Sequence, residues 1–440
     1  MRAKQAPVAS ADGGVAPVLE RRHARAGWRL RRPGLLALGP GLIAGASDND
    51  PTTVATMVVV GATTRYSLSW LTLLLYPLLG GVLVIAAQVG QASRSGLLGT
   101  VRRLYGRRLG VLLLVSVVVV NLITLGADLQ AGAAAIGLLL GVELRWLVLP
   151  YTALLIGMLL VGRHRGVERV LKYTVAIFAA YFFAAFLARP DWGAVIRSTL
   201  TPALSLRSEY VESGLAILGT TLTSYCYVWE VQREAAEARL ASRSSRRRAR
   251  LEAGLSMLVA VVTFWFILIA SGATLGMHHQ VAMTAQDAAA GLQPLAGPLA
   301  SHLFALGLLS SSLIAVPVLA DCSAQLIGEQ ARWEHSPGLG PTQAPAFYGA
   351  TVLAILVGAV IALLGLPPIQ LLYWASIAGG LATPIGLVLL LLVAGDSRAM
   401  GRGRVGKSLL AVGWTAAVVI AVVSALFLSQ QIRGLLPLPA

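Results

Sequence analysis

Long apolar stretches alternate with short polar segments along almost the whole chain. A helix that crosses a bilayer needs roughly 20 predominantly apolar residues, and eleven stretches are suited to this by length and composition. They lie at about 35–60, 67–90, 108–140, 146–162, 170–188, 211–232, 252–276, 296–326, 346–365, 369–394 and 408–429. The pattern predicts an all-α integral membrane protein with eleven transmembrane helices.

The composition agrees with this prediction. Of the 440 residues, 56 % are hydrophobic and only 12 % are charged, whereas soluble domains have about 25 % charged residues. A net charge of +16 can indicate nucleic-acid binding, but here the basic residues stand in short runs between apolar stretches. We therefore expect the lipid bilayer as a partner and no nucleic acid, and the sequence indicates no cofactor and no particular protein partner.

The basic residues also predict an orientation. Twenty-nine of the 35 Lys and Arg residues fall in the N-terminal segment and in alternate loops after it. The other six are Arg65, Arg145, Arg189, Arg197, Arg207 and Arg433. Because cytoplasmic loops are rich in Lys and Arg, we expect a multi-pass protein of the plasma (inner) membrane with a cytoplasmic N-terminus and an outside C-terminus. Residues 1–34 are expected to be a disordered cytosolic tail, and 431–440 a short outside tail.

The first apolar stretch is interrupted by Asp48, Asn49, Asp50 and Pro51. Proline removes a backbone donor and pushes the residue before it out of helical geometry, so we expect the helix to unwind at Asp50. A simple helix cap would explain an Asp before a Pro, but Ser or Asn would cap without a buried charge. A mid-membrane acid costs about 2.5–3.5 kcal/mol on insertion scales, which favours Asp50 as a cation ligand. Asp48 and Asn49 are secondary candidates, since a wet vestibule would also explain them.

The sixth stretch is interrupted by Gly219 and by a cluster of hydroxyl residues. The hydroxyl candidates are Thr220, Thr221 and Thr223, followed by the secondary candidates Ser224 and Tyr225. Ser and Thr also join helices in membranes, and spacing alone does not say which of them faces a site. Matching interruptions in two halves of a chain point to a transport site at the bilayer midplane. We therefore expect a transporter domain at 35–430 with repeats at 35–188 and 211–394 in opposite orientation, and an added span at 408–429.

Two further acids lie within predicted spans. Asp128 is near the middle of the third, where a proton or ion relay and a structural bond to a neighbouring Ser or Thr are both compatible with the sequence. Glu230 lies toward the cytosolic end of the sixth span, where an exit vestibule and plain interfacial solvation are equally acceptable. Both are secondary site candidates.

At these residues the sequence resembles the Nramp family of divalent metal transporters. The resemblance is carried by Gly39-Pro40-Gly41, by Asp50-Pro51, by the stretch 218–223 and by Asp128, and it extends over 35–430. It implies a LeuT-like inverted repeat formed by spans 1–5 and 6–10, followed by span 11. It also implies a divalent metal ion as the substrate, with the ion bound between spans 1 and 6.

The sequence departs from the family pattern at the site itself. Thr53, Thr220 and Thr223 occupy the family's Asn, Ala and Met positions, and Ser224-Tyr225 replaces its Pro-His. Methionine is a soft ligand that suits transition metals, whereas hydroxyls are hard oxygen donors. A metal site of Asp50, Thr53, Thr220 and Thr223 is therefore expected to prefer Mg²⁺ or Mn²⁺, held with its water in a wide cavity. The lost histidine removes a group that titrates near neutral pH, which favours passive or weakly coupled uptake.

Two alternatives remain at this point. The same fold can carry an organic cation or an amino acid, because fold does not determine function. The chain can also be a non-transporting sensor or scaffold, although a scaffold has no need of a buried acid. No motif points to a catalysed reaction, and an enzyme is not expected.

Overall fold

The structure is a computed structural model that describes most of the predicted spans. The described residues are 50–161, 180–240, 246–277, 284–289, 292–293, 297–331, 333, 340–401 and 403–435. Asp48, Asn49, the predicted tail at 1–34 and most of the predicted fifth span lie outside them.

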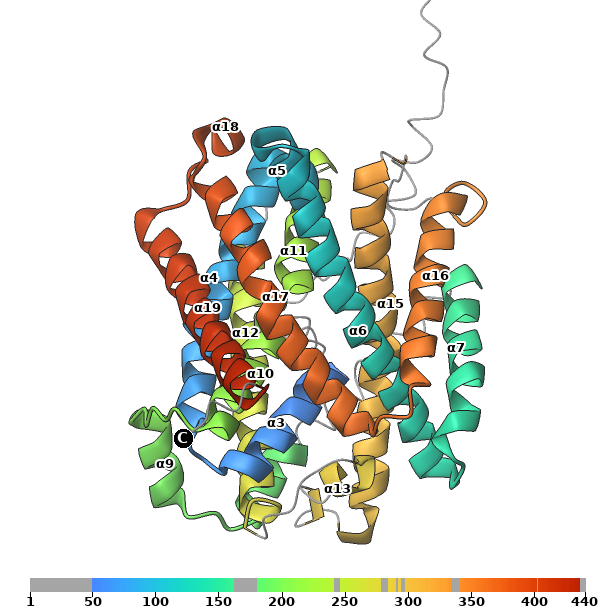
Figure 1. Cartoon of the computed structure of the whole chain (residues 1–440), viewed down its shortest axis with the longest axis vertical. Helices are drawn as coiled ribbons and strands as arrows, with labels where there is room; N and C mark the ends of the chain where they lie inside the picture. Colours follow the sequence, from blue (N-terminus) through green and yellow to red (C-terminus); the bar gives the residue numbers. More distant parts are fainter. Residues whose placement is uncertain are drawn as a thin grey trace, which may run out of the picture. The chain divides into compact units, whose positions relative to one another are not determined.

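The described residues form helices and contain no strand (Figure 1). The long helices are α3 (Pro51–Thr64), α4 (Ser69–Ser93), α6 (Arg107–Leu140), α7 (Leu144–Val161), α10 (Ser208–Thr221), α11 (Ser224–Leu240), α12 (Arg246–Thr274), α15 (Ala300–Ala331), α16 (Pro345–Ala362), α17 (Pro368–Gly395) and α19 (Lys407–Leu435). Shorter helices between them are α5 (Leu97–Tyr105), α9 (Trp192–Leu200), α13 (Ala285–Ala289) and α18 (Ser397–Met400). The all-helical prediction is confirmed for this part of the chain.

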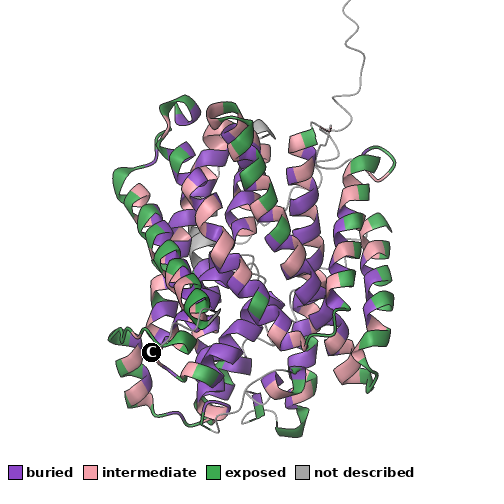
Figure 2. Cartoon of the chain, in the orientation of Figure 1, coloured by how far each residue is buried: buried purple, intermediate pink, exposed green. Residues whose placement is uncertain are grey.

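Seven helices among the described residues are long and apolar enough to cross a membrane. Two shorter apolar helices, α3 and α7, accompany them. Large apolar side chains are exposed along one face of α6 at Val111, Val115 and Val119, and on α19 at Val418 and Val422 (Figure 2). A spacing of four residues puts each set on one helix face, and these faces suit contact with lipid tails. The number of eleven spans stays a prediction.

Helix α3 is buried among α10, α12 and α17. Close helix approach depends on glycine here: a Cβ at Gly61 would meet the carbonyl of Leu268 and the backbone of Gly272 on α12. Small residues let membrane helices pack backbone to backbone. This contact holds the last turn of α3 against α12, and the polar residues at the start of α3, Thr52, Thr53 and Thr56, are also buried.

Helices α6 and α15 form the second part of the frame, with α16 and α7 beside them. The Ser312 hydroxyl on α15 donates to the backbone carbonyl of Asp128 on α6, at 2.6 Å. The Gln130 amide donates to the carbonyls of Ala362 and Leu366 at 3.1 and 2.8 Å. These hydrogen bonds satisfy carbonyls where α16 ends and tie α6 to the turn before Pro368, which is the first residue of α17.

Candidate functional site

Asp50 is the residue that caps α3. Its backbone is extended, Pro51 is the first helical residue, and the Thr53 amide donates to Asp50 Oδ1 at 2.7 Å. Asp50 therefore does cap the helix, as the simpler interpretation expected. It does not account for the whole carboxylate, because the Tyr225 hydroxyl on α11 donates to Asp50 Oδ2 at 3.2 Å. Only 6 % of Asp50 is exposed, so a side chain from the other half of the chain reaches a buried acid.

The break in the sixth span lies between α10 and α11. Helix α10 runs through Gly219 to Thr221 and α11 begins at Ser224, which leaves Leu222 and Thr223 non-helical. The expectation that Gly219 itself interrupts the helix is wrong. Gly219 is instead the point at which α10 crosses α17, where the Ser376 carbonyl and Gly380 leave no room for a Cβ.

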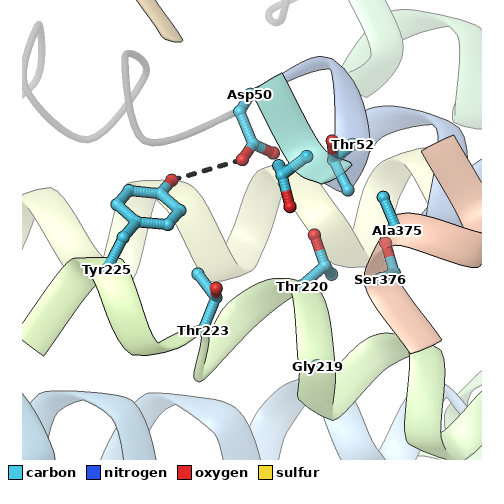
Figure 3. Close-up of a pocket in the computed structure, with 9 residues that line it drawn as sticks. Asp50, Thr52, Gly219, Thr220, Thr223, Tyr225, Ala375 and Ser376 are labelled. Atoms are coloured by element: carbon cyan, nitrogen blue, oxygen red, sulfur yellow. Dashed lines mark hydrogen bonds between the residues drawn. The ribbon is translucent and has the colours of Figure 1, made fainter. Parts of the chain in front are cut away.

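The two helix ends meet at a small pocket (Figure 3). The pocket is narrow and is lined by Asp50, Thr52, Thr124, Gly219, Thr220, Thr223, Tyr225, Ala375 and Ser376. Of the predicted site residues, the pocket brings together Asp50, Gly219, Thr220, Thr223 and Tyr225. Sequence reasoning missed four lining residues: Thr52 on α3, Thr124 on α6, and Ala375 and Ser376 on α17.

The residues that the structure describes do not enclose the wide cavity expected for a hydrated ion. The hydroxyls of Thr53 and Thr220 are bonded to each other at 2.8 Å, which joins α3 to α10 across the gap. The space left between the lining side chains suits a bare ion or a single water rather than an ion with a full shell of water. An ion that arrives hydrated must therefore shed water, or the two helix ends must separate.

A second acid lies directly beside this pocket. The Thr52 hydroxyl donates to Asp128 Oδ1 at 2.6 Å. Asp128 has no exposed surface, and its Oδ2 has no hydrogen-bond partner among the residues that the structure describes. No Lys, Arg or His among the described residues forms an ion pair with Asp50 or Asp128. Two buried carboxylates without a positive partner are costly, so the arrangement is suited to a cation.

Two of the secondary candidates lie elsewhere. Ser224 accepts a hydrogen bond from the Tyr227 hydroxyl at 3.0 Å and does not line the pocket. Glu230 forms an ion pair with Arg233 at 2.7 Å, in a partly exposed part of α11. Neither contacts Asp50. Asp48 and Asn49, as stated above, lie outside the described residues.

The donor set is made of hard oxygen atoms. The described residues contain no group of three or more His, Cys, Asp or Glu side chains placed to hold a metal ion. What the pocket offers is one carboxylate and several hydroxyls. Such a set suits Mg²⁺, Ca²⁺ or Mn²⁺ better than softer metals. A site with a single carboxylate binds a cation less tightly than a site with several. It therefore suits a transported ion, which must be released, better than a permanently bound one.

The fold and this site define a helical membrane protein built like a transporter, with a cation-type pocket between helix ends. Comparison with known proteins gives the family. The chain matches the family described as natural resistance-associated macrophage protein-like, Nramp, over residues 41–430. It therefore belongs to the Nramp family.

Relatives and solved structures agree with this membership. The chain is 27 % identical over 428 residues to the divalent metal cation transporter MntH of Deinococcus radiodurans, covering 93 % of this chain and 95 % of that protein. The fold is similar to that of the manganese transporter of Eremococcus coleocola, with a TM-score of 0.69 and 19 % identity, over 90 % of this chain and 87 % of the other. Mhp1, a nucleobase-cation-symport-1 family transporter, is also similar, with a TM-score of 0.55 and 13 % identity over 91 % and 94 % of the two chains.

Proposed function

We propose that this protein is a secondary transporter that moves a divalent metal cation across the membrane by alternating access. The observation that carries the proposal is the pair of buried acids, Asp50 and Asp128, with no basic partner among the described residues. An intramembrane acid that faces a pocket marks an ion pathway by default. The relative named as a divalent metal cation transporter supports the same conclusion.

In this proposal Asp50 supplies the charge that attracts the ion. Thr220 and Thr223 add hydroxyl oxygens from the other side of the pocket, and Thr53 joins them when its bond to Thr220 opens. Because all of these are hard donors, the preferred ion is of the Mg²⁺ or Mn²⁺ class. Asp128 holds the α3 end through Thr52 and adds negative potential beside the ion.

The domain plan and orientation belong to the same proposal. Two repeats at 35–188 and 211–394 in opposite orientation, with an added span at 408–429, give eleven spans and bring α3 and α10–α11 together from matching positions. The basic loops orient the N-terminus to the cytoplasm of a plasma membrane. Tyr225 stands where the family's histidine is expected, which supports transport without strong coupling to protons.

Uptake into proteoliposomes tests the proposal. Purified protein is reconstituted around a metal-sensitive fluorophore, and Mg²⁺, Mn²⁺ or Ca²⁺ is added outside. We expect saturable uptake of at least one ion, and competition among the three. Absence of divalent-ion uptake, with uptake of a radiolabelled organic cation or amino acid by the same vesicles, would move the assignment to the organic-substrate alternative. Absence of any uptake would favour the sensor or scaffold.

A further inference from the structure

The hydroxyl groups around the pocket differ in whether they are already hydrogen-bonded. Two lining residues, Thr124 and Thr223, form no side-chain hydrogen bond with any residue that the structure describes. Their oxygen atoms can bind a ligand without first breaking a bond inside the protein. The other lining hydroxyls are bonded within the protein: Thr52 to Asp128 at 2.6 Å, Thr220 to Thr53 at 2.8 Å, Tyr225 to Asp50 at 3.2 Å and Ser376 to Thr56 at 2.6 Å.

Thr124 differs from other threonines inside the helices. A helical threonine commonly donates to the carbonyl four residues earlier, as Thr152 does to Val148 on α7 at 2.7 Å and Thr263 does to Val259 on α12 at 2.8 Å. Thr124 lies near the middle of α6 and is only 5 % exposed, yet it forms no such bond within the described part of the chain. Its hydroxyl is left for the pocket that the residue lines.

Thr124 faces the start of α3. It lies one turn from Asp128 on the same face of α6, since residues four apart are neighbours on a helix. Asp128 is bonded to Thr52 in the first turn of α3, and Thr52 and Thr124 both line the pocket. The Thr124 hydroxyl therefore approaches the pocket of Asp50 from a helix that carries neither Asp50 nor Thr223.

The free oxygen atoms of the pocket come from two different groups of helices. Helix α6 packs with α7, α15 and α16, whereas α3 packs with α10 and α12 (Figure 1). Asp50 caps α3 and Thr223 follows α10. An ion that binds Asp50 and Thr124 at once joins the two groups, whereas an ion that binds Asp50 alone does not.

We propose that the Thr124 hydroxyl is a ligand of the transported ion and completes a set with the Asp50 carboxylate and the Thr223 hydroxyl. All three are hard oxygen donors, which suit a hard divalent cation. Because the ion then contacts both groups of helices, its binding favours the arrangement in which they lie close together. The inference rests on the proposed function and adds to it a ligand from α6.

Replacing the oxygen by sulfur tests direct contact with the ion. Thr124→Cys exchanges a hard hydroxyl for a soft thiol, and calorimetry in detergent compares it with wild type for Mg²⁺ and Cd²⁺. We expect the affinity for Mg²⁺ to fall at least about tenfold, the smallest loss typical of groups that support a metal site, and the ratio of Cd²⁺ to Mg²⁺ affinity to rise by at least that factor. A ratio equal to that of wild type would overturn the proposal.

Thr152→Cys is the matched control. Thr152 belongs to the same group of helices and is 3 % exposed, but its hydroxyl donates to the Val148 carbonyl and it does not line the pocket. We expect its ratio of Cd²⁺ to Mg²⁺ affinity to equal that of wild type. A rise as large as that of Thr124→Cys would show that the thiol acts without contact at the pocket, and would also overturn the proposal.

Two further variants separate the oxygen atom from the packing of the side chain. Thr124→Val keeps the branched shape and removes the oxygen, so Mg²⁺ affinity should fall about tenfold; Thr124→Ser keeps the oxygen and should retain most of the affinity. Thermal unfolding checks that each variant is folded, and the Cys and Ser variants carry the test if the Val variant is not. Wild-type Mg²⁺ affinity in Thr124→Val, or an equal loss in Thr124→Ser, would contradict the proposal. Failure of wild type to bind any divalent ion would count against the proposed function instead.

Discussion

The two halves of the pocket differ in charge and in how firmly they are held. The α3 half carries Asp50, whose carboxylate accepts from the Thr53 amide and from Tyr225, and it is tied to Asp128 through Thr52. The α10–α11 half is neutral and contributes hydroxyls from Thr220 and Thr223 beside two non-helical residues. One half therefore supplies attraction for a cation, and the other supplies oxygen atoms that set which cation fits.

This difference separates affinity from selectivity. Charge on one side determines whether a cation binds at all, since a buried carboxylate is stable only with a positive partner. The neutral oxygen donors on the other side determine how hard and how large the preferred cation is. Two of the three threonine departures from the family pattern, Thr220 and Thr223, lie in the neutral half. The third, Thr53, lies in the α3 half but is hydrogen-bonded to Thr220, whereas Asp50 follows the pattern. We therefore expect substitutions in the first half to change the strength of binding, and substitutions in the second half to change the ranking of ions.

The largest effect is expected for Asp50→Asn. It keeps a helix cap and removes the charge, so we expect ion affinity and uptake to fall by more than about 100-fold, beyond the range typical of groups behind a metal ligand. Asp191→Asn is the matched control, because Asp191 caps α9 in the same way but is exposed, with the Ala194 amide 3.1 Å from its Oδ1. Proteoliposome uptake compares the two. Equal losses in both variants would mean that capping, and not cation binding, is what Asp50 does.

Gly219→Ala should be the next largest, and its effect is on stability. The added methyl would run into the Ser376 carbonyl and Gly380 on α17, and forced packing of this kind costs about 1–3 kcal/mol. Gly214→Ala on the same helix meets nothing within 4 Å and should be neutral or stabilising by up to about 1 kcal/mol. Thermal unfolding of the two variants in detergent measures the contrast. A Gly219→Ala protein as stable as Gly214→Ala would show that α10 and α17 can move apart at no cost.

Tyr225→Phe tests the link between the two halves. It removes the hydroxyl that donates to Asp50 Oδ2 at 3.2 Å. Hydrogen bonds to charged groups are worth about 1.5–3 kcal/mol, and the unbound carboxylate loses more of this than the ion-bound one, because the bound ion contacts the same oxygen. We expect the affinity for the ion to rise about tenfold by calorimetry, with the ranking of ions unchanged. A changed ranking would mean that the Tyr225 hydroxyl also contacts the bound ion.

Thr223→Met should have the smallest effect on the affinity for the ion and the clearest effect on the order in which the site prefers different ions. A thioether in the neutral half makes the donor set softer. We expect the preference for Mn²⁺ over Mg²⁺ to rise about tenfold, which corresponds to about 1.4 kcal/mol. Competition of the two ions for uptake gives the ratio directly. A ratio equal to that of wild type would mean that position 223 does not contact the ion.

The sequence predicts the frame of this protein well, because a long apolar run has few other uses than a membrane span. Helix α6 was expected at 108–140 and occupies Arg107–Leu140. The short helix α5 was not predicted, since nine residues with a polar face form no long apolar run. Asp50 could also be predicted, because a charged residue in an apolar stretch needs a reason.

The other lining residues could not be found in this way. Thr124 and Ser376 are small polar residues within α6 and α17, which are otherwise apolar on almost every side, so periodicity does not say which face is buried. Gly219 shows the same limit. The sequence suggests a helix break at this glycine, whereas the crossing with α17 that requires glycine is visible only in the packed structure. Contacts between distant segments determine both.

Direct binding to the purified protein tests the central claim most directly. Calorimetric titration with Mn²⁺, repeated in the presence of Mg²⁺, should give one saturable site whose apparent affinity falls as Mg²⁺ rises, and Asp50→Asn should give no binding heat. Binding that persists in Asp50→Asn, or absence of binding by wild type up to millimolar ion, would contradict a divalent-cation site at the end of α3.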